Sequence, residues 1–189
     1  MDSALIISHT EKSITYLASV LKEAAISNIT TVSNAGEARR LLITKDFDLC
    51  IINAPLPDEF GERLAYDIAS KGISEVILIV KTELYDAMTA KTEDFGIITI
   101  AKPINQALLW SALKMAKVTH KRITSVQNEN KKLVQKIEDI RVIDRAKCIL
   151  ISHLSMSEPE AHRYIEKQAM DMRVPRRRVA EEILKTYEN

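Results

Sequence analysis

Residues 47–61 have the sequence FDLCIINAPLPDEFG, and this segment is the most informative about the fold. Its centre, Leu49 to Ile52, is a short and continuous apolar run that ends at the polar residue Asn53. Strands that are apolar on both faces are typical of parallel sheets that helices cover on each side. The segment therefore predicts a buried strand of a parallel sheet, with Asn53 at its carboxyl end.

Runs of the same kind recur on both sides of this strand. They are residues 5–7, 30–32, 76–80 and 97–100, and helical patterns separate them at residues 11–25, 35–44, 62–71 and 84–91. Asn34 and Glu37 are placed as the N-cap and the N3 partner of the second helix. Strands that alternate with helices in this way predict a doubly wound α/β domain with right-handed crossovers.

In such a domain the reaction centre lies where the strands end. The residues that follow the first, third, fourth and fifth strands are Ser8 and His9, Asn53, Val80, and Lys102 with Pro103. Together with the segment at residues 47–61, this layout resembles the receiver domain of two-component response regulators over about the first 115 residues. The resemblance implies a flavodoxin-like domain with five parallel strands.

The residues that would perform receiver chemistry are nevertheless absent, apart from Lys102. The family has an acidic pair where this chain has Ser8 and His9, the phosphoaccepting aspartate where it has Asn53, and Ser or Thr where it has Val80. An amide is no nucleophile toward a phosphoryl group, and without clustered carboxylates nothing holds Mg²⁺. We therefore predict a degenerate receiver that is not phosphorylated on aspartate.

The nearest remaining carboxylates are Asp48, which precedes the third strand, and Asp58, which lies several residues beyond its end. We interpret both as solvated surface charges. His9 has no cysteine or second histidine at metal-binding spacing, so we expect no metal site. We also expect no cofactor and no enzymatic activity.

A long helical pattern follows the α/β domain, because no glycine occurs after Asn105 and no proline occurs between Asn105 and Pro159. Six residues of this pattern alternate in steps of three and four, namely Ile123, Val126, Asn130, Leu133, Ile137 and Ile140. A buried Asn at an a position is satisfied when it meets its twin, which favours a parallel, in-register dimer. The stripe can instead pack against another helix of the same chain. We predict the homodimer, with a coiled-coil linker over residues 116–140.

The last part of the chain predicts two more helices. Ser157 and Glu160 form a capping box that opens a helix over residues 159–172, and another helix starts at Pro175. Apolar residues fall at helical spacing in both helices, namely Ala161, Ile165, Ala169 and Met170 in the first and Val179, Ile183 and Leu184 in the second. With the end of the long helix, they predict an all-α module with a three-helix core.

Four segments of this part carry a second resemblance. They read RVIDRAKCILI (141–151), LSMSEPEA (154–161), AMDMR (169–173) and VAEEI (179–183), and their order and spacing resemble the ANTAR domain. This family consists of three-helix RNA-binding modules that act on leader transcripts to prevent termination. The resemblance implies an ANTAR domain over residues 141–189 that recognises structured leader RNA. Cys148 and Glu166 depart from the pattern, which often has Gly and Arg there.

The charge of the chain also favours RNA as a partner. Residues 1–113 contain 10 Lys and Arg against 15 Asp and Glu, whereas residues 114–189 contain 17 against 11. A basic half is what binding to a polyanion needs. We expect RNA contacts from Arg145, Lys147, Arg163, Lys167, Arg173, Arg176, Arg177 and Arg178. The last three crowd a helix start, where positive charge opposes the helix dipole unless an anion binds there.

Two other functions are alternatives to RNA binding. A DNA-binding response regulator would need a helix-turn-helix, often with Gly in its turn, and no Gly follows Gly96. An adaptor that binds a protein through the receiver-like face would not need the arginines. Because no apolar run approaches the length of a membrane span and no secretion signal opens the chain, we expect a cytoplasmic protein.

Overall fold

The computed structural model describes residues 1–187, which pack into two compact units. The first unit comprises Met1–Thr124, and the second begins at Ser125. Each unit has a hydrophobic core of its own. The division falls between the boundaries expected at residues 115 and 140, which stay predictions.

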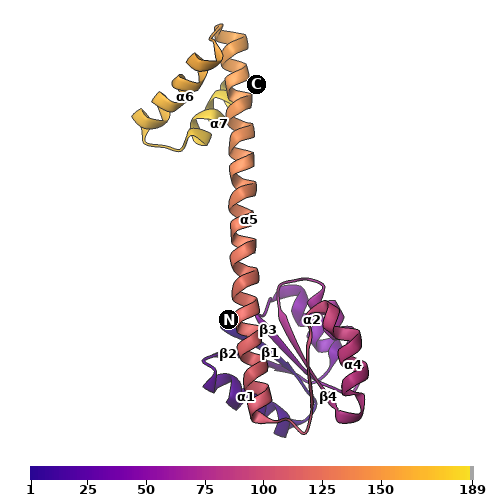
Figure 1. Cartoon of the computed structure of the whole chain (residues 1–189). Helices are drawn as coiled ribbons and strands as arrows, with labels where there is room; N and C mark the ends of the chain where they lie inside the picture. The colour runs from indigo at the N-terminus through magenta and orange to yellow at the C-terminus, as the bar shows by residue number, and fades with distance from the viewer. Residues whose placement is uncertain (188–189) are drawn as a thin grey trace. The chain divides into compact units, whose positions relative to one another are not determined.

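The first unit is built on a parallel sheet of five strands (Figure 1). The strands are β1 (Ser3–Ile7), β2 (Asn28–Val32), β3 (Leu49–Asn53), β4 (Glu75–Lys81) and β5 (Ile98–Lys102). Their order in the sheet is β2-β1-β3-β4-β5, and every neighbouring pair is parallel. This is the flavodoxin-like order, so the predicted doubly wound domain is confirmed.

Helices cover both faces of this sheet. They are α1 (Glu11–Glu23), α2 (Ala35–Thr44), α3 (Glu62–Ala69), α4 (Tyr85–Thr92) and α5 (Gln106–Leu154), with single 3₁₀ turns at η1 (Thr82–Leu84) and η2 (Glu93–Phe95). α1 and the first part of α5 pack on one face, whereas α2, α3 and α4 pack on the other (Figure 1). The predicted helices occur at the expected places, with ends that differ by one or two residues.

The alternation of side chains along β1 explains the two layers. Ala4 and Ile6 belong to the core under α1 and α5, whereas Leu5 and Ile7 belong to the core under α2 and α3, and all four are fully buried. Successive side chains of a strand point to opposite faces, so an apolar run fills both cores at once.

The two cysteines lie in different surroundings. Cys50 of β3 is buried, and this burial raises the pKa of its thiol to about 12. Cys148 of α5 is exposed. Both thiols are free, and the buried Cys50 serves as a small apolar residue of the core.

Polar side chains cap the N-termini of α2 and α5. The Asn34 side chain accepts a hydrogen bond from the backbone N–H of Glu37 at 2.8 Å, which confirms Asn34 as the N-cap of α2. The Glu37 carboxylate accepts from the N–H of Ser33 at 3.0 Å, one residue before the expected partner. The Asn105 side chain accepts from the N–H of Ala107 at 2.8 Å and so starts α5.

The second unit contains the rest of α5 together with α6 (Glu158–Met172) and α7 (Arg176–Tyr187). The capping box that opens α6 is present, with the Ser157 N–H donating to Glu160 Oε2 at 2.8 Å. The buried core residues come from all three helices, namely Ala146, Ile149, Leu150, Ala161, Ile165, Ala169, Val179, Ala180 and Ile183. The three-helix core is thus confirmed. The prediction that Met170 belongs to this core is wrong, because its side chain is 77% exposed.

Two general properties hold for the described residues. None of the helices within residues 1–187 combines the length and the apolar character that crossing a membrane requires. The same residues contain no group of three or more His, Cys, Asp and Glu side chains placed to hold a metal ion.

Candidate nucleic-acid interface

The ends of β1 and β3 carry a hydroxyl and an amide where a receiver has carboxylates. Asn53 is only 3% exposed, and its Nδ2 donates to the Oγ of the buried Ser8 at 3.0 Å. Among residues 1–187, Asn53 Oδ1 has no hydrogen-bonding partner. Val80 is buried and apolar, and His9 is exposed. The five strand-end residues therefore form no cluster of carboxylates.

The electrostatic surroundings of Lys102 differ from those of a lysine in an acidic site. Its Nζ donates to the backbone carbonyl of Ala54 at 2.5 Å. Burial lowers the pKa of Lys102, and the positive charge of Lys81 lowers it further. In an acidic site the neighbouring carboxylates would raise that pKa instead. The Thr82 hydroxyl donates to the Lys102 carbonyl, and the peptide bond between Lys102 and Pro103 is cis.

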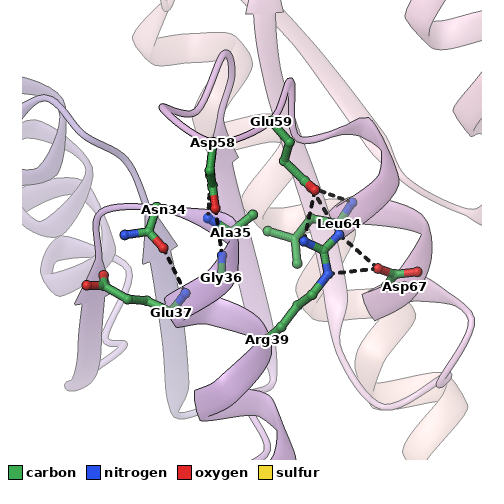
Figure 2. A network of polar contacts seen from close by, with 9 residues as sticks. All are labelled: Asn34, Ala35, Gly36, Glu37, Arg39, Asp58, Glu59, Leu64 and Asp67. Carbon is green, nitrogen blue, oxygen red and sulfur yellow. Dashed lines mark hydrogen bonds and ion pairs between the residues drawn. The ribbon is translucent and has the colours of Figure 1, made fainter.

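Asp58 has a structural task in the loop after β3, as Figure 2 shows. Its two carboxylate oxygens accept from the backbone N–H groups of Ala35 at 2.9 Å and Gly36 at 2.8 Å, at the start of α2. These hydrogen bonds lower the pKa of Asp58. The side chain is exposed, as expected, but its interpretation as a merely solvated charge is wrong, because it caps a helix.

A second group of charged side chains connects the same loop to two helices (Figure 2). The Arg39 guanidinium of α2 donates to Glu59 at 2.8 Å and to Asp67 of α3 at 3.0 Å. Hydrogen bonds to these carboxylates raise the pKa of Arg39 against the opposing effect of burial. Glu59 also accepts from the N–H of Leu64 at 3.2 Å. The loop that follows Asn53 is thus held from α2 and from α3.

Asp48 likewise is no free surface charge. Its carboxylate accepts from the backbone N–H groups of Asp2 at 2.5 Å and Ser3 at 3.0 Å, and it lies 3.4 Å from His120 Nε2. Partial burial opposes ionisation, but the hydrogen bonds outweigh it, so the pKa of Asp48 is lowered. The solvated interpretation of this residue is also wrong.

In the second unit, several of the eight expected RNA-contacting cations are paired with carboxylates of the same unit. The Lys147 ammonium lies 2.8 Å from Asp144 and 2.9 Å from Glu158, which raises its pKa. Its side chain is only 16% exposed. Lys147 therefore connects α5 to the start of α6.

The three arginines that open α7 are also paired. Arg176 lies 2.8 Å from Glu166 of α6. Arg177 lies 2.7 Å from Asp139 of α5 and 2.8 Å from Glu181, and hydrogen bonds to both raise its pKa. The third arginine of the row is 3.7 Å from Glu182. Carboxylates of the protein thus compensate the positive charge for which the sequence suggested a bound anion.

The remaining expected cations lie elsewhere on the unit. Arg145 is exposed on α5, and Arg173 is the exposed C-cap of α6, with a left-handed backbone at φ 55°. Arg163 and Lys167 are exposed, four residues apart on α6, and within residues 1–187 neither forms an ion pair. Arg163 and Lys167 thus lie on one face of α6 without ion pairs in the described chain, whereas the arginines that open α7 are paired with carboxylates.

A groove of about 460 Å³ lies beside Arg163 and Lys167. Its lining comes from the end of α5, the following turn and α6, namely Leu154, Ser155, Met156, Glu160, Arg163, Tyr164 and Lys167. Apolar and cationic side chains thus meet in one concave surface. The sequence indicated the two cations, but the contribution of Leu154 and Met156 was missed.

The expected dimerisation seam lies on the exposed surface of α5. Its five apolar members, Ile123, Val126, Leu133, Ile137 and Ile140, are between 41% and 58% exposed. Asn130 is exposed as well. No helix of the described chain covers this stripe, which leaves the dimer as a prediction.

The sequence is similar to known transcriptional regulators. The profile of the ANTAR domain matches residues 131–184. The transcriptional regulatory protein PdtaR from two strains of Mycobacterium tuberculosis is 28% identical over 170 residues, which is 90% of this chain and 83% of the relative. The similarity thus extends through both units.

Several solved structures similar to this chain are receiver domains. The receiver domain of an HD domain-containing protein from Pseudomonas fluorescens has a TM-score of 0.55 and 24% identity, and covers 64% of this chain and 97% of its own length. A receiver domain protein from Clostridium thermocellum has a TM-score of 0.57 and 17% identity over 65% of this chain and 99% of its own. These similarities establish the receiver fold. The chain therefore combines a receiver fold with an ANTAR domain, which matches residues 131–184.

Proposed function

We propose that this regulator binds hairpins in leader RNA through its ANTAR domain and thereby prevents transcription termination. The observation that carries the proposal is the ANTAR match at residues 131–184, which falls on a three-helix unit with an independent core. At the level of the family, the chain is an RNA-binding regulator of transcription antitermination. Its leader RNA and its hairpin are the specific part of the proposal.

A dimer is the second part of the proposal. The exposed apolar stripe on α5, with Asn130 at an a position, supports a parallel coiled coil between two copies. Two ANTAR domains in one dimer would engage two hairpins of one transcript. The second binding event is then intramolecular, so affinity rises without new contacts in either domain.

Independence from aspartyl phosphorylation is the third part. The support comes from the buried Asn53 and Ser8 pair and from the lowered pKa of Lys102, which has the positive charge of Lys81 near it in place of an acidic group. Such a domain would act through contacts with a protein partner on its receiver-like surface, or simply as a structural part of the regulator.

The test starts from a pool of RNA hairpins with one fixed stem and a randomised unpaired loop. Selection on the full chain should enrich a defined set of loops. Binding of a selected hairpin should exceed binding of DNA with the same sequence, and it should weaken steeply as salt rises because phosphate contacts release counterions. Equal and weak binding to RNA and DNA would contradict the proposal and favour the adaptor.

The antitermination step needs a separate measurement. The selected hairpin is placed so that its stem overlaps the stem of an intrinsic terminator in a template for in vitro transcription. Added protein should increase the fraction of full-length transcript. A template whose hairpin carries an unselected loop is the control, and readthrough from it should not change.

A further inference from the structure

The cations of the ANTAR domain fall into two classes. Lys147, Arg176 and Arg177 each lie within 3 Å of a carboxylate oxygen of the same unit. Arg163 and Lys167 are exposed and form no ion pair in the described part of the chain. A cation that is already paired must give up its partner before it can bind phosphate, whereas an unpaired one gives up only water. The available charge is therefore on α6, not at the start of α7.

The groove beside Arg163 and Lys167 offers an aromatic surface. Tyr164 is 39% exposed, and its side chain is not among those that pack against the three-helix core. Leu154, at the end of α5, is 44% exposed in the same groove. Exposed apolar and aromatic atoms in the same groove as two cations suit a flat, uncharged ring that is attached to phosphates.

The carboxylate in the groove is already engaged. Glu160 accepts from the Ser157 N–H at 2.8 Å and from the Ser157 hydroxyl at 2.7 Å. These hydrogen bonds lower its pKa, and the positive charge of Arg163 lowers it further without forming an ion pair in the described chain. Its charge belongs to the capping box of α6. Arg163 and Lys167 therefore outnumber one carboxylate that is already fixed, and the groove favours an anionic ligand.

We propose that this groove binds an unpaired nucleotide of the RNA loop, with the base stacked on Tyr164 and the flanking phosphates bound by Arg163 and Lys167. The inference rests on the proposed function and assigns its RNA contact to one surface. A base-paired stem cannot use the groove, because stacking on a side chain requires an unstacked base. The groove therefore distinguishes loops from duplexes.

The experiment uses the full chain and a hairpin selected as above, with 2-aminopurine at each loop position in turn. Stacking on Tyr164 should change the fluorescence at one position. Tyr164→Leu should abolish this change and weaken binding about tenfold or more, whereas Tyr164→Phe should retain both, since the ring remains. Arg163→Gln with Lys167→Gln should lower the slope of log affinity against log salt by about one for each phosphate that is no longer neutralised.

Lys185→Gln is the matched control, because it removes one exposed positive charge from α7 in the same unit, at a residue that is not among the expected RNA contacts. It should leave the fluorescence change intact and reduce affinity less than the changes in the groove. If hairpins bind the wild type, and Tyr164→Leu, Arg163→Gln and Lys167→Gln bind them equally well, the groove assignment is overturned while the proposed function stands. If no hairpin binds the wild type, the proposed function itself fails. Binding of an acidic peptide in the groove, in place of RNA, would also overturn the assignment.

Discussion

Asn53 differs from an aspartate only in its amide nitrogen, yet we expect that a carboxylate at this position alone would not be phosphorylated. Phosphoryl transfer needs a metal ion to neutralise the charge that develops on the phosphate. Ser8, which is buried and hydrogen-bonded to Asn53, and the exposed His9 stand where the receiver family has its acidic pair. Neither side chain has a carboxylate that could bind Mg²⁺.

We therefore expect Asn53→Asp to remain unmodified when it is incubated with acetyl phosphate and Mg²⁺. The measurement is the intact mass, and the wild type should be equally unmodified. A variant with Asp at positions 8, 9 and 53 is the comparison, because it supplies the whole acidic set. Addition of one phosphate to the single variant would contradict the argument that the missing metal site prevents the reaction.

The hydrogen bonds of Asp58 predict how the stability of the receiver-like unit depends on pH. Hydrogen bonds from the N–H groups of Ala35 and Gly36 lower its pKa in the folded protein. Since the folded pKa lies below the unfolded value of about 4, the stabilisation is complete above that pH and is lost as the pH falls through the folded value.

Urea unfolding of wild type and Asp58→Asn at several pH values tests this prediction. The wild type should have the higher midpoint at pH 7, because the amide has only one oxygen to accept the two N–H groups. The difference should shrink below about pH 4, where the wild-type carboxyl also becomes neutral. A difference that does not depend on pH would show that the charge of Asp58 contributes nothing.

Among the helices, α6 shows the limit of a sequence pattern. Ile165 and Met170 both fit the apolar stripe expected for this helix, but Ile165 is 1% exposed and Met170 is 77% exposed. A stripe at helical spacing is broad, and which of its edges faces the core depends on where α5 and α7 lie.

The two residues should respond differently to truncation. Ile165→Ala should lower the free energy of unfolding by about 2–5 kcal/mol, because it leaves a cavity among α5, α6 and α7. Met170→Ala should change it by no more than about 0.5 kcal/mol. Chemical denaturation followed by circular dichroism measures both, and equal decreases would contradict the arrangement of α6.

The seam on α5 makes a prediction about assembly. Asn130→Leu should change the oligomeric state or the register, because the buried amide no longer selects an in-register dimer. Asn128→Leu is the matched control, since it makes the same exchange on the same exposed helix but outside the seam. Sedimentation equilibrium distinguishes them, and monomers for wild type and Asn130→Leu alike would refute the coiled coil.

For the whole molecule, the sequence predicted the fold well because its signals are local. Apolar runs such as Leu49 to Ile52 and caps such as Asn34 and Ser157 act within a few residues, and the structure has each of them where it was expected. Only the ends of the elements shifted, since helices fray at their termini.

The candidate site was predictable only in part, because its contacts join distant parts of the sequence. Arg177 pairs with Asp139, 38 residues earlier, and no local pattern marks such a pair. The sequence therefore identified the cations of the ANTAR domain but could not tell which of them the protein itself neutralises. The engagement of Asp48 and Asp58 was missed for the same reason.

The contrasting surroundings of the two cysteines have a practical consequence for labelling. A thiol reacts as its thiolate, so the buried Cys50, whose pKa is raised to about 12, should be inert in the folded chain. Cys148 is exposed on α5 and should react with a maleimide dye. The unmodified sequence thus provides one specific attachment point for a fluorophore on the ANTAR domain, and intact mass should show a single adduct before unfolding and two after it.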